Sequence, residues 1–300
     1  MFLASVFAII IGFLLGLLGG GGSILTVPVL VYLVDIPAKS AIVTSLIVVG
    51  CTSLIATFHH ACKGYVCWKT GAVFGSAGML GAFLGGRLTA YVPGALLLVL
   101  LGVVMLIAAF SMILKNSKQS SDTSTCTSDT PICPLELPVL AILFDGFFLG
   151  IVTGLVGVGG GFLLVPALAH LAKLPIHAAI GTSLFIITLQ STAALAGHAN
   201  HLDIDPSLTL TITFLAIVGS FAGASASNHI PAHHLKRSFG YFVLILGSYL
   251  LYKEVNQAIV LQVQTLIENN REFIIGASSV IAFMLVYRLW AWLHTKSNKI

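Results

Sequence analysis

Two glycine clusters interrupt apolar segments of the chain, at 19–22 and at 157–161. Glycine runs make poor helix interior, so each cluster predicts a break, with a second helical piece starting near Ser23 or near Phe162. The first amides of a helix lack intrahelical partners and carry the positive end of the helix dipole, which favours an anion. Tight helix packing is the alternative explanation for the glycines. The residues expected to line an anion site are Gly20, Gly21, Gly22, Ser23, Gly159, Gly160 and Gly161.

Polar side chains also lie inside the apolar segments that follow the two clusters, as the pairs Thr44-Ser45 and Thr182-Ser183 and as Gln190. Ser183 and Gln190 are seven residues apart, so they share one face of a helix. A glutamine within the membrane is costly unless it finds a partner, whereas hydroxyls often join neighbouring helices. We expect all five side chains to hydrogen-bond the same anion, with helix–helix contact as the alternative for the hydroxyls.

Three titratable residues are candidates for coupling transport to protons. Asp145 is the only acid well inside a predicted span, and intramembrane carboxylates commonly serve in proton relays. His60 and His198 occupy matching positions in the repeat described below. A location at the membrane interface is the alternative for each of the three.

Metal and enzyme chemistry have weaker support in the sequence. Cys62 and Cys67 lie near His59 and His60, but two cysteines at this spacing are a weak metal signal, and no metal site is expected. Ser23 lacks a recognisable activating base, and the hydrolase motifs HExxH and GxSxG are absent. The Walker A motif is absent too, so the chain is expected to need neither ATP nor a cofactor and not to be an enzyme.

Composition then defines the class of protein that must position these residues. The 300 residues include 14 Lys and Arg and 10 Asp and Glu, so 8% are charged, against about a quarter in soluble domains. The hydrophobic content is 57% and the mean hydropathy is +1.03. These values exclude a soluble enzyme, a disordered chain and a disulfide-stapled secreted domain. They predict an all-α polytopic protein of the cell (inner, cytoplasmic) membrane.

The chain also contains an internal repeat. One offset of 138 residues aligns two halves without a gap from Gly12 to Pro93. Matched residues include Pro28 and Pro166, Pro37 and Pro175, Ser53 and Ser191, and Gly81 and Gly219. Shared glycine, proline and serine at a constant offset are the strongest signal here, and such repeats are typical of secondary transporters. The expected divisions are a first repeat at 1–114, a polar linker at 115–136 that we expect in the cytoplasm, a second repeat at 137–252, and a surface segment with one extra C-terminal transmembrane helix at 253–300.

Charge in equivalent loops indicates that the two repeats are inverted. The loop near 59–69 carries Lys63 and Lys69, whereas its counterpart near 198–206 carries Asp203 and Asp205. Inversion needs an odd number of crossings, which follows if each broken segment is a re-entrant hairpin followed by three helices. With 59–69 in the cytoplasm, ten Lys and Arg then lie inside and four outside, as the positive-inside rule requires.

The segments GLLGGGGSILTVPVL (16–30) and GLVGVGGGFLLVPAL (154–168) resemble the sulfite exporter TauE/SafE family of membrane permeases. The Pro and Thr-Ser elements follow both at the family's spacing, and the resemblance extends to about residue 252. It implies a transporter of sulfur-containing anions, such as sulfite or sulfonates, with the substrate between the glycine-rich hairpins and the Thr-Ser helices. This chain departs from the usual pattern at Gly20 and Ser23, which stand where the second half has Val158 and Gly161.

The sequence as a whole predicts a permease that moves a small anion by alternating access. The expected partners are that anion and the lipid bilayer, with no nucleic acid, and a homodimer is left open. The alternatives are a His-rich divalent-metal transporter, based on His60 and His198, and an intramembrane hydrolase, based on Ser23.

Overall fold

The computed structural model describes residues 2–18, 20–114, 139–161, 164, 165, 168, 174, 176–198, 205–226 and 232–254. The linker expected at 115–136, most of the half-helix expected from Phe162 and the C-terminal helix expected after 254 lie outside these residues. Residues 1–254 belong to one compact unit.

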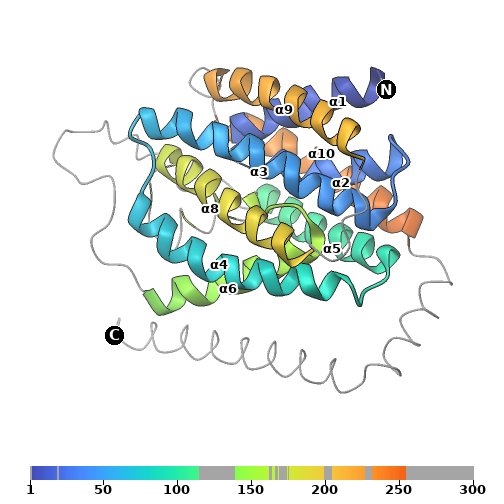
Figure 1. The fold of residues 1–300 in the computed structure, drawn as a ribbon. Coiled ribbons are helices and arrows are strands. Elements are labelled where there is room, and N and C mark those ends of the chain that lie inside the picture. The colour runs from blue at the N-terminus through green and yellow to red at the C-terminus, as the bar shows by residue number, and fades with distance from the viewer. Residues whose placement is uncertain are drawn as a thin grey trace. The chain divides into compact units, whose positions relative to one another are not determined.

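All regular structure in the described ranges is helical, as the sequence predicts (Figure 1). The helices are α1 (Phe2–Leu18), α2 (Ser23–Tyr32), α3 (Ala38–Cys62), α4 (Trp68–Thr89), α5 (Gly94–Leu114), α6 (Val139–Val156), α8 (Ile176–Gly197), α9 (Pro206–Ala226) and α10 (Ala232–Glu254). Within the described part of the chain, three helical stretches are long and apolar enough to cross a membrane: Ala38–Cys62, Ala178–Gly197 and Pro206–Ala226.

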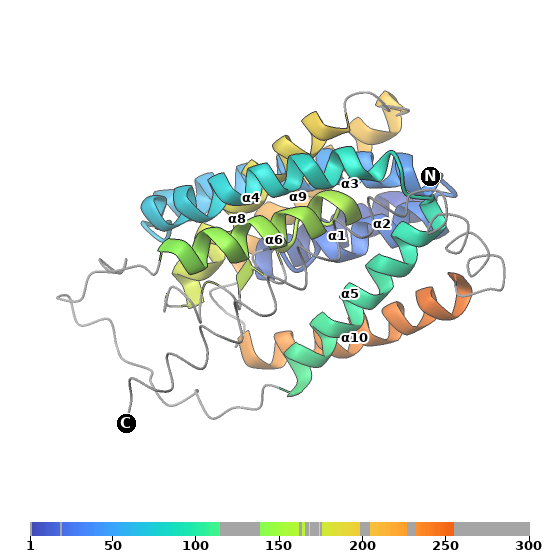
Figure 2. The ribbon, with the colours of Figure 1, turned by 90° about the horizontal axis from the view of Figure 1, so that it is seen from below.

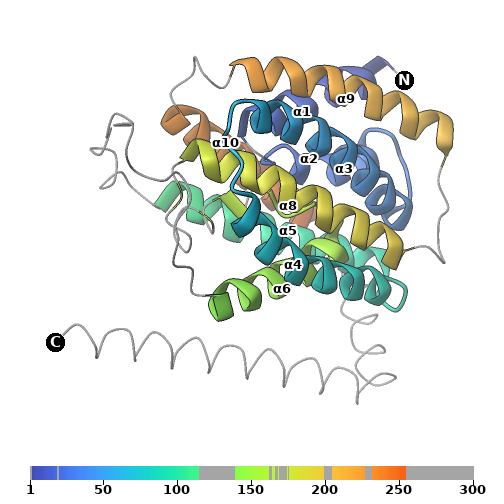
Figure 3. The same cartoon turned by 60° about the vertical axis from the view of Figure 1, so that its left-hand side comes forward.

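Four long helices lie side by side in the order α9, α3, α8 and α4 (Figures 1 and 3). Helix α1 packs on α9 and α6 packs on α4, so each half contributes its first helix to the other half's bundle. Helices α5 and α10 pack on each other beside this group (Figure 2). The two halves are therefore interleaved.

Glycine faces allow this close packing. A Cβ on Gly12 of α1 would collide with the carbonyl of Ala216 in α9, and one on Gly150 of α6 would collide with that of Gly78 in α4. Small residues at such positions let helix backbones approach closely within a membrane. Gly12 and Gly150 thus serve helix packing inside the chain.

These contacts follow the sequence repeat. The contact of Gly12 with Ala216 and that of Gly150 with Gly78 exchange under the offset of 138 residues. Helix α1 runs parallel to α9, because Gly12 meets Ala216 and Gly16 meets Ser220. Helix α4 runs parallel to α6 in the same way.

The matched helices α3 and α8 run in opposite directions. Gly50 of α3 lies against Ser191 of α8, whereas His60, further along α3, lies against Gly181, earlier in α8. Two equivalent helices of the repeat are therefore antiparallel neighbours.

Helix α2 is a short piece that turns back along α1. Gly22 packs against the α1 backbone between Ile11 and Leu15, which places the chain reversal directly after α1. The helix starts at Ser23, as predicted, and has 10 residues, or a length of about 15 Å at 1.5 Å per residue. Its residues from Ser23 to Leu30 are all buried.

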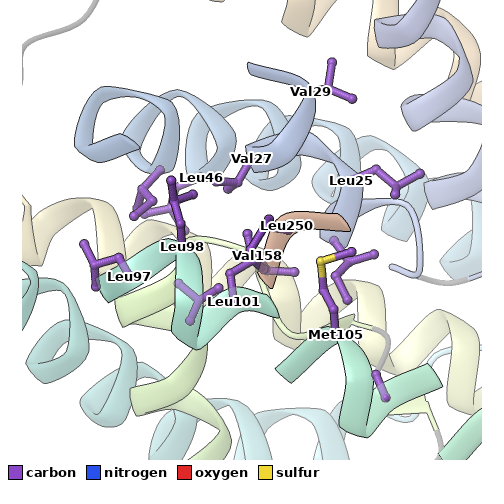
Figure 4. Packing of buried hydrophobic residues seen from close by; sticks show 14 of the residues in the cluster. Leu25, Val27, Val29, Leu46, Leu97, Leu98, Leu101, Met105, Val158 and Leu250 are labelled. Carbon is purple, nitrogen blue, oxygen red and sulfur yellow. The ribbon is translucent and has the colours of Figure 1, made fainter. Parts of the chain in front are cut away.

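A hydrophobic cluster holds α2 and the second glycine turn in place. Leu25 and Val27 of α2 pack together with Leu101 and Met105 of α5 and Val158 of the turn (Figure 4). Val158 is 2% exposed, so the turn is anchored through the one non-glycine residue inside its cluster.

Candidate functional site

The two glycine turns touch each other. A Cβ added to Gly20 would lie 2.6 Å from Cα of Gly161, and one added to Gly161 would lie 2.5 Å from Cα of Gly20. Ile187 of α8 fills the remaining space, because its Cδ1 would be 2.5 Å from either added atom. The sequence predicts a cavity between the turns; in this conformation direct contact closes it at Gly20 and Gly161.

Backbone conformation explains why glycine is needed in the turns. Gly20 has a φ of +105°, and Gly157, Gly159 and Gly160 have φ values of +72°, +66° and +64°. Side chains other than hydrogen are strained in this left-handed region. The clusters therefore reverse the chain as well as permit its close approach.

Ser23 hydrogen-bonds to the backbone of the first glycine turn. Its hydroxyl donates to the carbonyl oxygen of Gly20 at 2.6 Å, and its amide donates to the same oxygen at 3.2 Å. Gly21, Gly22 and Ser23 are all buried. A hydroxyl committed in this way is no activated nucleophile, so the hydrolase alternative gains no support from the structure.

The Thr-Ser pairs lie in different surroundings. Ser45 donates to the carbonyl of Gly157 at 2.8 Å, which ties α3 to the second turn. Thr182 accepts from the amide of Cys67 at 3.0 Å, and Ser183 donates to Ile180 in its own helix at 2.8 Å. Thr44 is buried in α3. Ser45 thus hydrogen-bonds directly to a glycine turn.

Gln190 lies at the second turn. Its Oε1 would be 3.7 Å from a Cβ on Gly160 and accepts from the Thr153 hydroxyl at 3.4 Å. Its amide nitrogen lies against Gly78 of α4. Thr153 could not be selected from the sequence repeat, because its counterpart in the first half is the apolar residue Leu15.

Ser191 is a second residue that the sequence argument does not select for the site. Its hydroxyl would be 3.5 Å from a Cβ on Gly159, and its side chain is 2% exposed. The sequence does contain a signal that could have identified Ser191, because this residue matches Ser53 in the repeat.

The surroundings of the turns are electrically neutral in the described part of the chain. Its buried polar residues include no lysine or arginine, and Lys39, Lys63, Lys69, Arg87 and Lys253 are exposed. An anion here would be stabilised by peptide dipoles, hydroxyls and the Gln190 amide.

The proposed coupling residues lie away from the turns. Asp145 is half-buried in α6, twelve residues and therefore about 18 Å along the helix before Gly157. His60 packs beside Gly181 at the start of α8, and His198 follows its end. The two histidines are therefore separated by about 25 Å along α8.

Metal transport is not favoured by this geometry. One ion cannot bridge histidines at opposite ends of α8. Cys67 is part of a disulfide, so it offers no thiolate. In the residues that the structure describes, no three His, Cys, Asp or Glu side chains converge on a common point.

A separate pocket of about 630 Å³ lies between α1, α2 and α10. Its lining residues are Phe7, Ile10, Ile11, Leu14, Leu25, Pro28, Val29, Tyr32, Leu33, Phe242, Leu246, Tyr249 and Leu250. This lining offers almost no hydrogen-bond donors, so the pocket is a poor place for an anion.

Comparison with known proteins identifies related chains. The family described as Sulfite exporter TauE/SafE matches residues 4–250. A probable membrane transporter protein of Xylella fastidiosa (strain 9a5c) is 32% identical over 247 residues, covering 81% of this chain and 92% of its own. YdhB of Bacillus subtilis, also named a probable membrane transporter protein, is 26% identical over 81% of this chain and 97% of its own. MJ0441 of Methanocaldococcus jannaschii, named likewise, is 28% identical over 81% and 94%. No solved structure gives a significant match.

Proposed function

The chain belongs to the sulfite exporter TauE/SafE family of membrane transporters, and from this membership we propose that it is a permease for a small sulfur-containing anion, such as sulfite or a sulfonate. The observation that carries the proposal is the meeting of two glycine turns, with Ser45 and Gln190 beside them. This arrangement offers neutral donors and peptide dipoles to an oxyanion, and no lysine or arginine is buried among the residues whose side chains the structure describes.

The same proposal includes inverted repeats in the cytoplasmic membrane. The antiparallel contact of α3 with α8 supports inversion, because the two helices are equivalent in the repeat. Helix α2, at about 15 Å, spans half of a hydrocarbon core of about 30 Å. A short helix buried on all sides fits a re-entrant hairpin, since membrane-depth backbone outside helices survives only inside protein.

In an alternating-access mechanism, the contact between the two glycine turns corresponds to a closed state of the transporter. The touching backbones of Gly20 and Gly161 belong to a conformation in which the anion has no passage at that point. Transport requires the turns to separate, so that their amides and the neighbouring side chains face the anion. Proton coupling through Asp145, His60 and His198 is part of the proposal; the two histidines lie about 12–14 Å along α8 from Gln190, so they would act beside the path and not on the anion.

Uptake into proteoliposomes tests the function. We expect saturable flux of sulfite or of a simple sulfonate, no flux of Zn²⁺, and loss of anion flux in Gly159→Leu, whose side chain would displace Val49 and Ile187. Gly64→Leu is the matched control, because Gly64 also has a left-handed φ, at +72°, but has open space around it. Absence of anion flux in the unaltered protein, or flux of Zn²⁺ instead, would overturn the proposal.

A further inference from the structure

The Gln190 amide is a buried donor next to the second glycine turn. The side chain is 1% exposed, and its Oε1 accepts a long hydrogen bond of 3.4 Å from Thr153. Its Nε2 has no hydrogen-bond partner among the residues that the structure describes. A buried donor without an acceptor is destabilising, so its presence needs a reason.

The next residue repeats the pattern. Ser191 is 2% exposed, and its hydroxyl also lacks a partner within the described ranges. Its oxygen lies toward Gly159, whereas Gln190 places Oε1 toward Gly160 and the unpartnered Nε2 against Gly78 of α4. Two consecutive side chains of α8 therefore carry unpartnered donors, one beside the second glycine turn and one beside α4.

Other hydroxyls on α3 and α8 donate hydrogen bonds to carbonyl oxygens of their own helix. Four threonines of α3 and α8 donate to the carbonyl oxygen four residues earlier, at 2.7–3.1 Å: Thr52, Thr57, Thr188 and Thr192. This intrahelical bond is the common solution for a hydroxyl in an apolar helix. Ser191 departs from it, and its unpartnered hydroxyl lies beside Gly159 of the second turn.

The first half of the repeat lacks an equivalent of the glutamine. Thr52 occupies the position that matches Gln190, and its hydroxyl donates to Val48 at 2.7 Å. Ser53 matches Ser191, is fully buried and has an unpartnered hydroxyl in the described structure. The first half therefore presents one such donor where the second presents two.

We propose that Gln190 Nε2 and Ser191 Oγ form an asymmetric oxyanion subsite, in which they donate to two oxygens of the sulfur group of the transported anion, Ser191 from beside Gly159 and Gln190 from beside Gly78. This inference rests on the proposed function and adds which donors select the anion. Sulfite and sulfonates each present three oxygens on one sulfur, so two donors on one side leave the third oxygen, or the organic substituent, for the opposite side. Hydrogen bonds to a charged acceptor are stronger than neutral ones, which makes this pair a determinant of affinity.

The test measures sulfite transport and thermal unfolding of the full-length protein for Gln190→Leu and Ser191→Ala. We expect each variant to raise the KM for sulfite by about tenfold or more, since each loses a hydrogen bond to a charged ligand. We also expect each variant to unfold in the absence of sulfite at the same temperature as the unaltered protein or at a higher one, because an unpartnered buried donor has been removed. A purely structural role predicts the opposite, a lower unfolding temperature with an unchanged KM.

Thr188→Val is the control within α8, because the Thr188 hydroxyl already donates to Leu184. It should leave the KM for sulfite unchanged. Ser53→Ala tests the asymmetry and should raise KM less than Ser191→Ala does.

The outcomes separate the two proposals. If the unaltered protein shows no saturable anion flux, the proposed function fails and this inference falls with it. If the flux is saturable but Gln190→Leu and Ser191→Ala keep its KM, only the inference is overturned. If Gln190→Leu does not fold, the KM of Ser191→Ala decides, and an equal effect of Ser53→Ala would overturn the asymmetry.

Discussion

Gly20 and Gly161, which lie in different halves of the repeat, are in direct backbone contact. Neither glycine can gain a methyl group without moving the other turn, because the added carbon would lie 2.5–2.6 Å from the Cα atom of the other glycine. The contact is also not one between repeat-equivalent residues, since Gly20 matches Val158. The closed state of the proposed permease therefore depends on one asymmetric contact between its two turns.

Replacement of Gly161 by alanine tests this contact without backbone strain, because Gly161 does not have a left-handed φ. The added methyl forces the two turns apart, so we expect the free energy of unfolding to fall by about 1–3 kcal/mol, as for other overpacked sites. Transport should change as well, since the closed conformation is the one disfavoured. Denaturant or thermal unfolding in detergent and proteoliposome flux provide the two measurements.

Gly64→Ala is the comparison for Gly161→Ala. Its methyl group meets no atom within 4 Å, so only the strain of its φ of +72° remains. It should leave anion flux intact. Wild-type flux and stability in Gly161→Ala would show that the two turns do not make this contact in the membrane.

Ile187→Val removes the Cδ1 methyl that lies between Gly20 and Gly161. A smaller side chain weakens the closed packing, and we expect a loss of about 0.5–1.5 kcal/mol in stability together with faster anion turnover. Ile186→Val, an equally buried neighbour on α8, should cost a similar amount of stability without faster turnover. Equal turnover in the two variants would contradict a gating role for Ile187.

The hydrogen bonds of Asp205, just before α9, predict that the stability of the protein depends on pH. Its carboxylate accepts from the Ser207 hydroxyl at 2.9 Å and from the Ser207 amide at 3.0 Å, and these bonds lower the pKa of the carboxyl below its usual value. A lowered folded-state pKa stabilises the fold above the unfolded-state pKa, and this contribution is lost as the pH falls through the folded value. The unfolding temperature should therefore fall more on acidification in the unaltered protein than in Asp205→Asn.

Ser207→Ala refines the Asp205 experiment. It removes the main cause of the shift, so the pKa of Asp205 should rise toward its usual value and the acid-dependent loss should shrink. If the unfolding temperature depends on pH identically in the unaltered protein and in Asp205→Asn, the hydrogen bonds of Asp205 do not contribute to stability.

Inverted topology can be examined by labelling single cysteines with a membrane-impermeant thiol reagent. In a background without the exposed thiols of Cys51 and Cys62, we expect Lys63→Cys and Asp203→Cys to react from opposite sides of the membrane. The two positions belong to equivalent loops, near 59–69 and near 198–206, so parallel repeats would place both on one side. Labelling of both cysteines from the same side would contradict the inversion.

The sequence by itself determined the class of protein and the local breaks in its helices. Scarce charge excludes a soluble fold, and the offset of 138 residues identifies equivalent positions before any contact is known. The break after Leu18 and the start of α2 at Ser23 follow from local properties of glycine, which do not depend on distant residues. For that reason they could be predicted correctly.

Only the tertiary structure decided which polar groups meet. Thr182 and Ser45 both belong to Thr-Ser pairs in apolar helices. Thr182 accepts a hydrogen bond from the amide of Cys67, whereas Ser45 donates one to the carbonyl of Gly157 in the second turn. A hydroxyl on an apolar helix can bond to its own helix or to another one, and the choice depends on what packs against it. Thr188 donates within α8, whereas the hydroxyl of Ser191, three residues later, has no partner among the described residues and faces a glycine turn supplied by another part of the chain.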